Sequence, residues 1–93
     1  MDKTIIEAIT NKRKLLFWYE SKDGDMVQRE TTPVCYGTDK NGNLKLRAFD
    51  STDIPKLWLV DKMQGVELGE TYTLTQEPTP VDKHIPNVIA KVV

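Results

Sequence analysis

Hydrophobic and polar positions follow helical spacing only in the first part of the chain. The apolar side chains at positions 5, 6, 8 and 9 fall on one face of a helix. Thr4 and Glu7 have the spacing of a capping box, in which both side chains accept hydrogen bonds from backbone N–H groups of the first turn. The pattern predicts a short amphipathic helix over residues 3–13, with its isoleucines against a sheet.

From residue 14 onward the spacing changes to a period of two, which is typical of half-buried strands. The predicted strands cover residues 15–19, 26–31, 34–38, 44–49, 56–63 and 70–76. Asp23-Gly24 and Asn41-Gly42 predict two hairpins with type I′ turns, because both central residues of that turn need positive φ. Pro33 predicts a bend between the second and third strands, since it cannot donate to a central ladder.

The last part of the chain begins with a connector that contains Pro78 and Pro80. Pro86 suits the first turn of a helix, and the valines and isoleucine of 87–93 would form its apolar face. A β-branched strand is the alternative for 87–93.

The predicted fold class is mainly β, a small antiparallel barrel with an N-terminal helix and a short C-terminal helix. Closure would remove the exposed edges that a lone sheet of short strands leaves. We expect a single domain over 1–93, with the helix at 3–13, the barrel at 14–76, and the connector and second helix at 77–93.

Composition limits the class of protein further. At 93 residues, 39% of them hydrophobic and 29% charged, the chain is sufficient for one core. The net charge of −1 gives no overall attraction to nucleic acid or to anionic membrane. Cys35 stands alone, so no internal disulfide is expected, and residues 1–14 do not have the pattern of a signal peptide. We expect a cytoplasmic protein with no membrane partner.

Residues that carry catalytic chemistry are scarce. His84 is the only histidine, and one His with one Cys cannot make a zinc site. Cys35, in an apolar strand, is predicted to be a small core residue. Asp23 and Asp25 flank a hairpin glycine and are more simply explained as turn formers, although count alone does not exclude a carboxylate site. The sequence therefore predicts no enzyme, no metal and no cofactor.

A basic and aromatic group of strand residues remains. Lys45 and Arg47 are two apart and project from one face, and Lys56 and Lys62 bracket Trp58 at the same parity. Cations interleaved with an aromatic side chain suit phosphates and stacked bases. The alternative is a set of solvated strand residues interleaved with acids. The candidate ligand-binding residues are Arg29, Lys45, Arg47, Lys56, Trp58 and Lys62.

Four segments also have the order and spacing of a known family. They are Leu15–Tyr19 before Asp23-Gly24, Arg29–Pro33, Leu44–Asp50 and Lys56–Met63. Together they resemble the WYL domain, a small Sm-like/SH3-like β-barrel found mostly in bacterial and phage proteins, over most of residues 3–75. The resemblance implies a regulatory module that binds nucleic acids or nucleotide-like effectors.

The chain departs from that family at several positions. Only Leu46 is kept from the Trp-Tyr-Leu tripeptide, and Leu59 replaces a central arginine. Lys45, Lys56 and Lys62 stand at family ligand positions, but lysine lacks the bidentate fork of arginine. Arg29 matches fully and would either bind ligand or brace the barrel. The family's usual winged helix does not precede the barrel in this chain.

The first functional hypothesis is a non-catalytic, WYL-like module for a single-stranded nucleic acid or another phosphorylated ligand. The alternative is a protein–protein adaptor, from a phage or mobile element that engages a host factor, or a homodimer. Three features motivate the alternative, because protein interfaces are rich in aromatic residues and poor in charge. They are the near-zero net charge, the loss of arginine at Leu59, and the aromatic side chain of Trp18 or Trp58.

Overall fold

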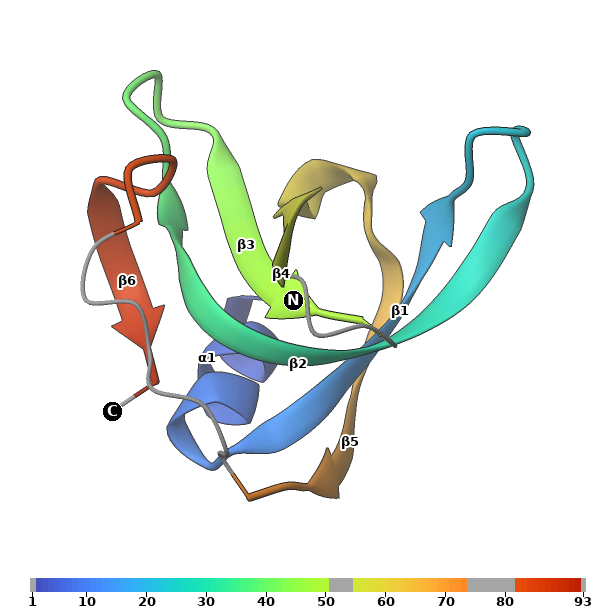
Figure 1. Ribbon diagram of the computed structural model, residues 1–93, viewed down its shortest axis with the longest axis horizontal. Coiled ribbons are helices and arrows are strands. Elements are labelled where there is room, and N and C mark those ends of the chain that lie inside the picture. Colours follow the sequence, from blue (N-terminus) through green and yellow to red (C-terminus); the bar gives the residue numbers. More distant parts are fainter. Residues whose placement is uncertain (1, 51–54, 74–81, 93) are drawn as a thin grey trace.

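A computed structural model of the chain describes residues 2–50, 55–73 and 82–92. Within them the fold is mainly β, with one α-helix at the start and one antiparallel sheet (Figure 1). The sheet order is β4-β3-β2-β1-β5, and β6 pairs with β2. The elements are α1 (Asp2–Thr10), β1 (Arg13–Glu20), β2 (Met26–Thr38), β3 (Leu44–Phe49), β4 (Pro55–Leu59), the 3-10 turn η1 (Val60–Lys62), β5 (Gln64–Thr71) and β6 (Asn87–Lys91).

One long strand, β2, organises the sheet. Its first half pairs with β1, and its second half pairs with β3 on one edge and with β6 on the other. Figure 1 shows β2 curving from the β1 hairpin to the β3 hairpin. We expected two strands separated at Pro33, but they form one strand. The β2–β3 ladder shifts register between Pro33 and Cys35, and this irregularity accommodates the missing N–H of proline.

The expected closed barrel is not formed by the strands that the structure describes, because β4 and β5 end the sheet without pairing to each other. Side chains fill the gap between β1 and β4 instead. The backbone N–H of Leu59 donates a hydrogen bond to Tyr19 Oη at 3.2 Å. The ring of Trp58 meets those of Phe17 and Tyr19 edge to face, with centroids 5.2 and 5.0 Å apart. The sheet is therefore bent and open, and aromatic packing joins its two arms.

Both predicted hairpins are present, but their turns are not type I′. In the β2–β3 turn, Asp39 N–H donates to Asn43 C=O at 2.9 Å and Gly42 N–H donates to Asp39 C=O at 3.1 Å. Gly42 has φ +83°, and Lys12 is the one non-glycine residue with positive φ in the described part of the chain. The loop is thus a turn followed by a left-handed glycine. The β1–β2 turn, around Gly24, has the same bonds.

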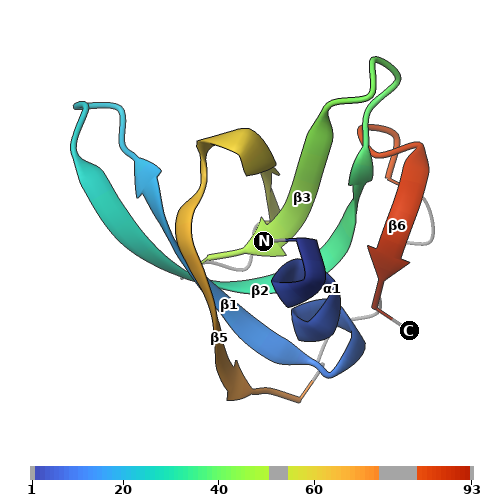
Figure 2. The ribbon, with the colours of Figure 1, turned by 180° about the vertical axis from the view of Figure 1, so that it is seen from behind.

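The N-terminal helix covers one end of the core. It begins at Asp2, so Thr4 lies inside its first turn and the predicted capping box is wrong. It ends at Thr10, and Lys12 follows with φ +51°, a left-handed conformation that stops a helix. Figure 2 shows α1 against the bent sheet between β1 and β6. No helix among the described residues is long and apolar enough to span a bilayer.

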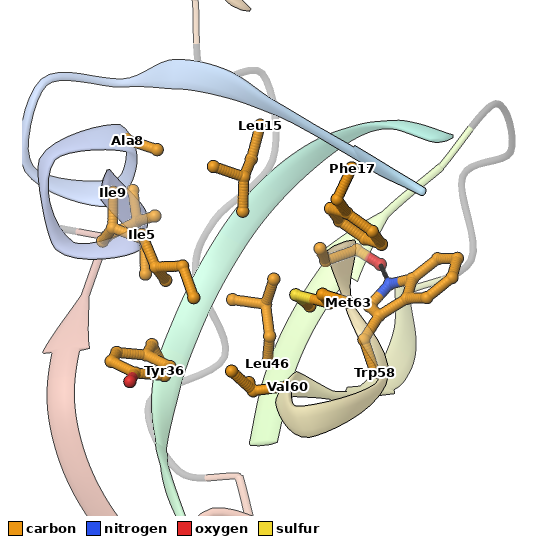
Figure 3. Packing of buried hydrophobic residues seen from close by; sticks show 12 residues of the cluster. Ile5, Ala8, Ile9, Leu15, Phe17, Tyr36, Leu46, Trp58, Val60 and Met63 are labelled. Atoms are coloured by element: carbon orange, nitrogen blue, oxygen red, sulfur yellow. Dashed lines mark hydrogen bonds between the residues drawn. The ribbon is translucent and has the colours of Figure 1, made fainter. Parts of the chain in front are cut away.

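The core lies inside the curve of β2 (Figure 3). The predicted isoleucine stripe is confirmed in part, since Ile5 and Ile9 are buried while Ile6 is half-buried. Tyr36, fully buried on β2, donates its hydroxyl hydrogen bond to the Asp2 carboxylate and so ties α1 to the sheet. The buried cluster comprises Ile5, Ala8, Ile9, Leu15, Phe17, Tyr36, Leu46, Ala48, Trp58, Val60, Met63 and Val92.

The predicted C-terminal helix is wrong, and the strand alternative is correct. Residues 87–91 form β6, because the second half of β2 offers a free edge whose backbone groups need partners. Val92 N–H extends the pairing by donating to Val34 C=O at 2.9 Å. The predicted strand 56–63 ends early in η1, and β5 begins at Gln64 rather than at 70. The connector at 77–81 lies outside the described residues.

Residues 85–87 approach the backbone of β2 closely at Gly37. A Cβ there would lie 2.1 Å from Asn87 O and 2.7 Å from Ile85 Cγ2, and Ile85 is only 1% exposed. The segment therefore needs glycine at this point of β2.

We predict that Gly37→Ala lowers the free energy of unfolding by about 1–3 kcal/mol, because the added methyl must displace the 85–87 backbone. Urea unfolding followed by circular dichroism measures the change. Gly42→Asn is the control: nothing lies within 4 Å of a Cβ there, and asparagine tolerates left-handed φ. Equal effects of the two substitutions would contradict the close approach at Gly37.

Candidate ligand-binding site

The predicted basic residues do not share one face. In the β3–β4 register, Lys45 lies opposite Leu59 and Arg47 lies opposite Leu57, so these four side chains share one side of the sheet. Lys56 pairs with Ala48 and therefore belongs to the other side. Lys45 and Arg47 therefore do not converge with Lys56 on one face of the sheet.

Trp58 lies in the core rather than at a ligand surface. It is opposite Leu46 in the β3–β4 ladder and only 5% exposed. Its Nε1–H donates to Ala48 C=O at 3.2 Å, as the dashed line in Figure 3 marks. Strand alternation separates two faces without saying which one is inside, so the parity of Trp58 was compatible with either position.

Three of the predicted cations are already paired with carboxylates. The pairs are Lys45–Asp39 at 3.7 Å, Arg47–Asp82 at 2.8 Å and Lys56–Asp50 at 2.6 Å. A phosphate would have to compete with each carboxylate for its cation, so these residues do not make a free anionic-ligand surface along the strands.

The two remaining predicted residues lie apart from the others. Lys62 is exposed on η1. Arg29 lines a pocket of about 420 Å³ at the first half of β2, together with Lys14, Glu30 and Asp50. Arg29 Nε is buried and makes no hydrogen bond. Glu30 pairs with Lys14 at 3.3 Å and Asp50 pairs with Lys56 at 2.6 Å, so both of these carboxylates already have a cation.

A different pocket collects unbalanced positive charge. It measures about 350 Å³ and lies between the β2–β3 turn and residues 83–86. We name it the lysine pocket after Lys40, Lys45 and Lys83, which line it together with His84. Leu57 and Pro86 add apolar walls.

Asp39 supplies the carboxylate in the lysine pocket. Hydrogen bonds from the backbone N–H of Asn43 and then of Asn41 hold the pKa of Asp39 below its usual value, with a contribution from Lys45. An ionised Asp39 balances Lys45, and the charges of Lys40 and Lys83 remain in excess. The pocket is thus suited to an anion with several oxygens, such as a phosphate group.

The sequence identified Lys45 but not its neighbours in the lysine pocket. Lys40 is in a turn, and Lys83 and His84 follow the connector, with no local pattern that links them. They meet because the segment after residue 81 folds back over β2. His84 is exposed at the pocket.

An ion pair fixes this returning segment to the sheet. Arg47 Nε donates to Asp82 Oδ2 at 2.8 Å and Nη2 donates to Oδ1 at 3.4 Å, while His84 N–H donates to Oδ1 at 2.9 Å. Burial by itself would raise the pKa of Asp82, but the bonds from Arg47 and His84 outweigh it and lower the pKa. Asp82 therefore positions Lys83 and His84 at the pocket.

Cys35 lies on β2 directly opposite Arg47 and is buried, which confirms the prediction of a small core residue. Burial, and then the nearby Asp82 carboxylate, raise the pKa of its thiol. A thiol that stays protonated is a poor nucleophile.

Residues 2–50, 55–73 and 82–92 contain no cluster of three or more His, Cys, Asp or Glu side chains that could hold a metal ion. Comparisons with known protein families, curated proteins and solved structures found no match to this chain.

We predict that Asp82→Asn lowers the free energy of unfolding at pH 7 by about 1–3 kcal/mol, because a charged hydrogen-bonded pair is lost. Since folding depresses the pKa of Asp82, its contribution is present above the unfolded pKa near 4 and is lost as pH falls through the lower folded value. Urea midpoints measured between pH 7 and pH 2 should therefore converge for the variant and the parent chain at the acid end.

Asp61→Asn is the control for this series, because Asp61 is exposed on η1. A gap between Asp82→Asn and the parent chain that stays constant down to pH 2 would contradict the role of the ionised carboxylate.

Proposed function

We propose that this chain is a non-catalytic binding module that holds a phosphorylated ligand, such as the end of a nucleic acid strand, in the lysine pocket. The observation that carries the proposal is the gathering of Lys40, Lys45 and Lys83 around one pocket, where Asp39 is the single carboxylate among the described lining residues. Apolar walls from Leu57 and Pro86 would accept the non-phosphate part of such a ligand.

Within the same proposal the fold is an open relative of the Sm-like/SH3-like barrel, of WYL type and with a regulatory role in the cytoplasm. Antiparallel strands around a single core support this view, as does the link from Leu59 to Tyr19 across the open side. Lys45 is the residue at which the family resemblance and the lysine pocket coincide. The buried free thiol of Cys35 favours a reducing compartment.

We predict that a short, mixed-sequence, 5′-phosphorylated single-stranded DNA binds at low salt and that its affinity falls as salt rises. Lys40→Gln combined with Lys83→Gln removes the two lysines that Asp39 does not balance. It should weaken binding by at least about tenfold and reduce the log–log salt slope by about 2, one for each lost phosphate contact. Fluorescence anisotropy of a labelled strand measures both quantities.

The matched control is Lys3→Gln combined with Lys22→Gln, which changes the net charge equally at two exposed positions elsewhere. The proposal is wrong if no binding occurs at low salt, or if the two double variants weaken it to the same extent.

The second candidate function is a protein–protein adaptor. The specific observation that favours it is the exposure of large apolar side chains on the β1–β2 hairpin, where Trp18 is 43% and Met26 is 41% exposed. Tryptophan and methionine are enriched in protein interfaces.

A further inference from the structure

Trp18 and its neighbours form one face of the sheet, away from the core. In the β1–β2 ladder Trp18 lies opposite Gln28 and Glu20 lies opposite Met26, while β5 places Glu67 opposite Leu16. Residues two apart on a strand, and those directly opposite across a ladder, project from the same side. We name the surface made by Leu16, Trp18, Glu20, Met26 and Glu67 the tryptophan face.

The position of the Trp18 indole is set by the neighbouring strand. Its Cδ1 lies 3.2 Å and its Nε1 3.8 Å from the place where a Cβ of Gly65 would be. The ring thus rests against backbone that carries no side chain, at a point where β5 bulges relative to β1. Even so, Trp18 remains 43% exposed.

Negative charge surrounds this exposed indole. Glu20 and Glu67 are exposed, and neither belongs to an ion pair within the described part of the chain. Glu30 also projects from this side, but Lys14 pairs with it at 3.3 Å. The tryptophan face is therefore negatively charged, whereas the lysine pocket is positively charged. The tryptophan face would repel a phosphate backbone.

We infer that the tryptophan face docks a protein segment that bears arginine or lysine. Tryptophan is the side chain that binds a cation best over its ring, and Glu20 and Glu67 supply counter-charges beside it. Leu16 and Met26 add apolar contact for the stem of a long cationic side chain. The inference develops the adaptor function and does not depend on the lysine pocket.

The experiment uses three synthetic peptides of equal length, in which arginine, glutamate or leucine alternates with serine. Tryptophan fluorescence reports contact with Trp18, because Trp58 is buried, and calorimetry gives the affinity. The arginine peptide should bind and shift the emission, whereas the glutamate and leucine peptides should not.

Two variants locate the contact. Glu20→Gln combined with Glu67→Gln should lower the affinity for the arginine peptide by about three- to tenfold. Trp18→Leu should lower this affinity to a similar extent. Glu7→Gln combined with Asp61→Asn makes the same change in net charge at exposed positions on α1 and η1, and should leave the affinity unchanged.

Other outcomes overturn the inference. They are failure of the arginine peptide to bind, equal binding of the leucine peptide, and equal weakening by both pairs of carboxylate substitutions. Self-association abolished by Trp18→Leu would assign the face to a second copy of the chain instead. Lys83→Ala should bind the arginine peptide as the parent chain does. A loss of DNA binding at the lysine pocket can therefore be told apart from a loss of peptide binding at the tryptophan face.

Discussion

The bend of β2 is the constraint on which the rest of the structure depends. Because the strand curves, its first half can pair with β1 while its second half pairs with β3 and β6. The curve encloses Phe17, Tyr36 and Leu46 on its concave side, where α1 and Trp58 complete the burial. A domain of this size has little stability to spare, so the packing inside the curve must also hold the open side of the sheet together. The hydrogen bond from Leu59 to Tyr19 does so without a strand pair.

Features set by neighbouring residues were the ones that the sequence predicted well. Turn residues located both hairpins, and alternation located most strands, because these signals act within a few residues. The turn type was missed, since Asp-Gly and Asn-Gly also suit a turn in which only the glycine is left-handed. Residues 87–91 form a strand because they pair with the free edge of β2, which lies about fifty residues earlier in the chain. Local propensity could not reveal this distant partner.

The candidate site was predicted less well for the same physical reason. The alternation of Lys45 and Arg47 with apolar residues does not show which cations will meet carboxylates. Arg47 pairs with Asp82 only because the chain returns alongside β2. That return also brings Lys83 and His84 to the turn that holds Lys40. Lys45 and Lys56 pair with carboxylates nearby in the sequence, and Arg47 pairs with a distant one. Charge pairing therefore removed most of the predicted basic surface, and the return of the chain created another one.

Net charge conceals this arrangement. A value of −1 averages a positive pocket near the β2–β3 turn and a negative face on the β1–β2 hairpin. Figures 1 and 2 show these two hairpins on opposite sides of the molecule. Opposite surfaces of opposite charge allow two unlike partners to bind without competing for the same side chains. Each surface is anchored to a different half of β2, so the strand that curves around the core also sets the separation of the two surfaces.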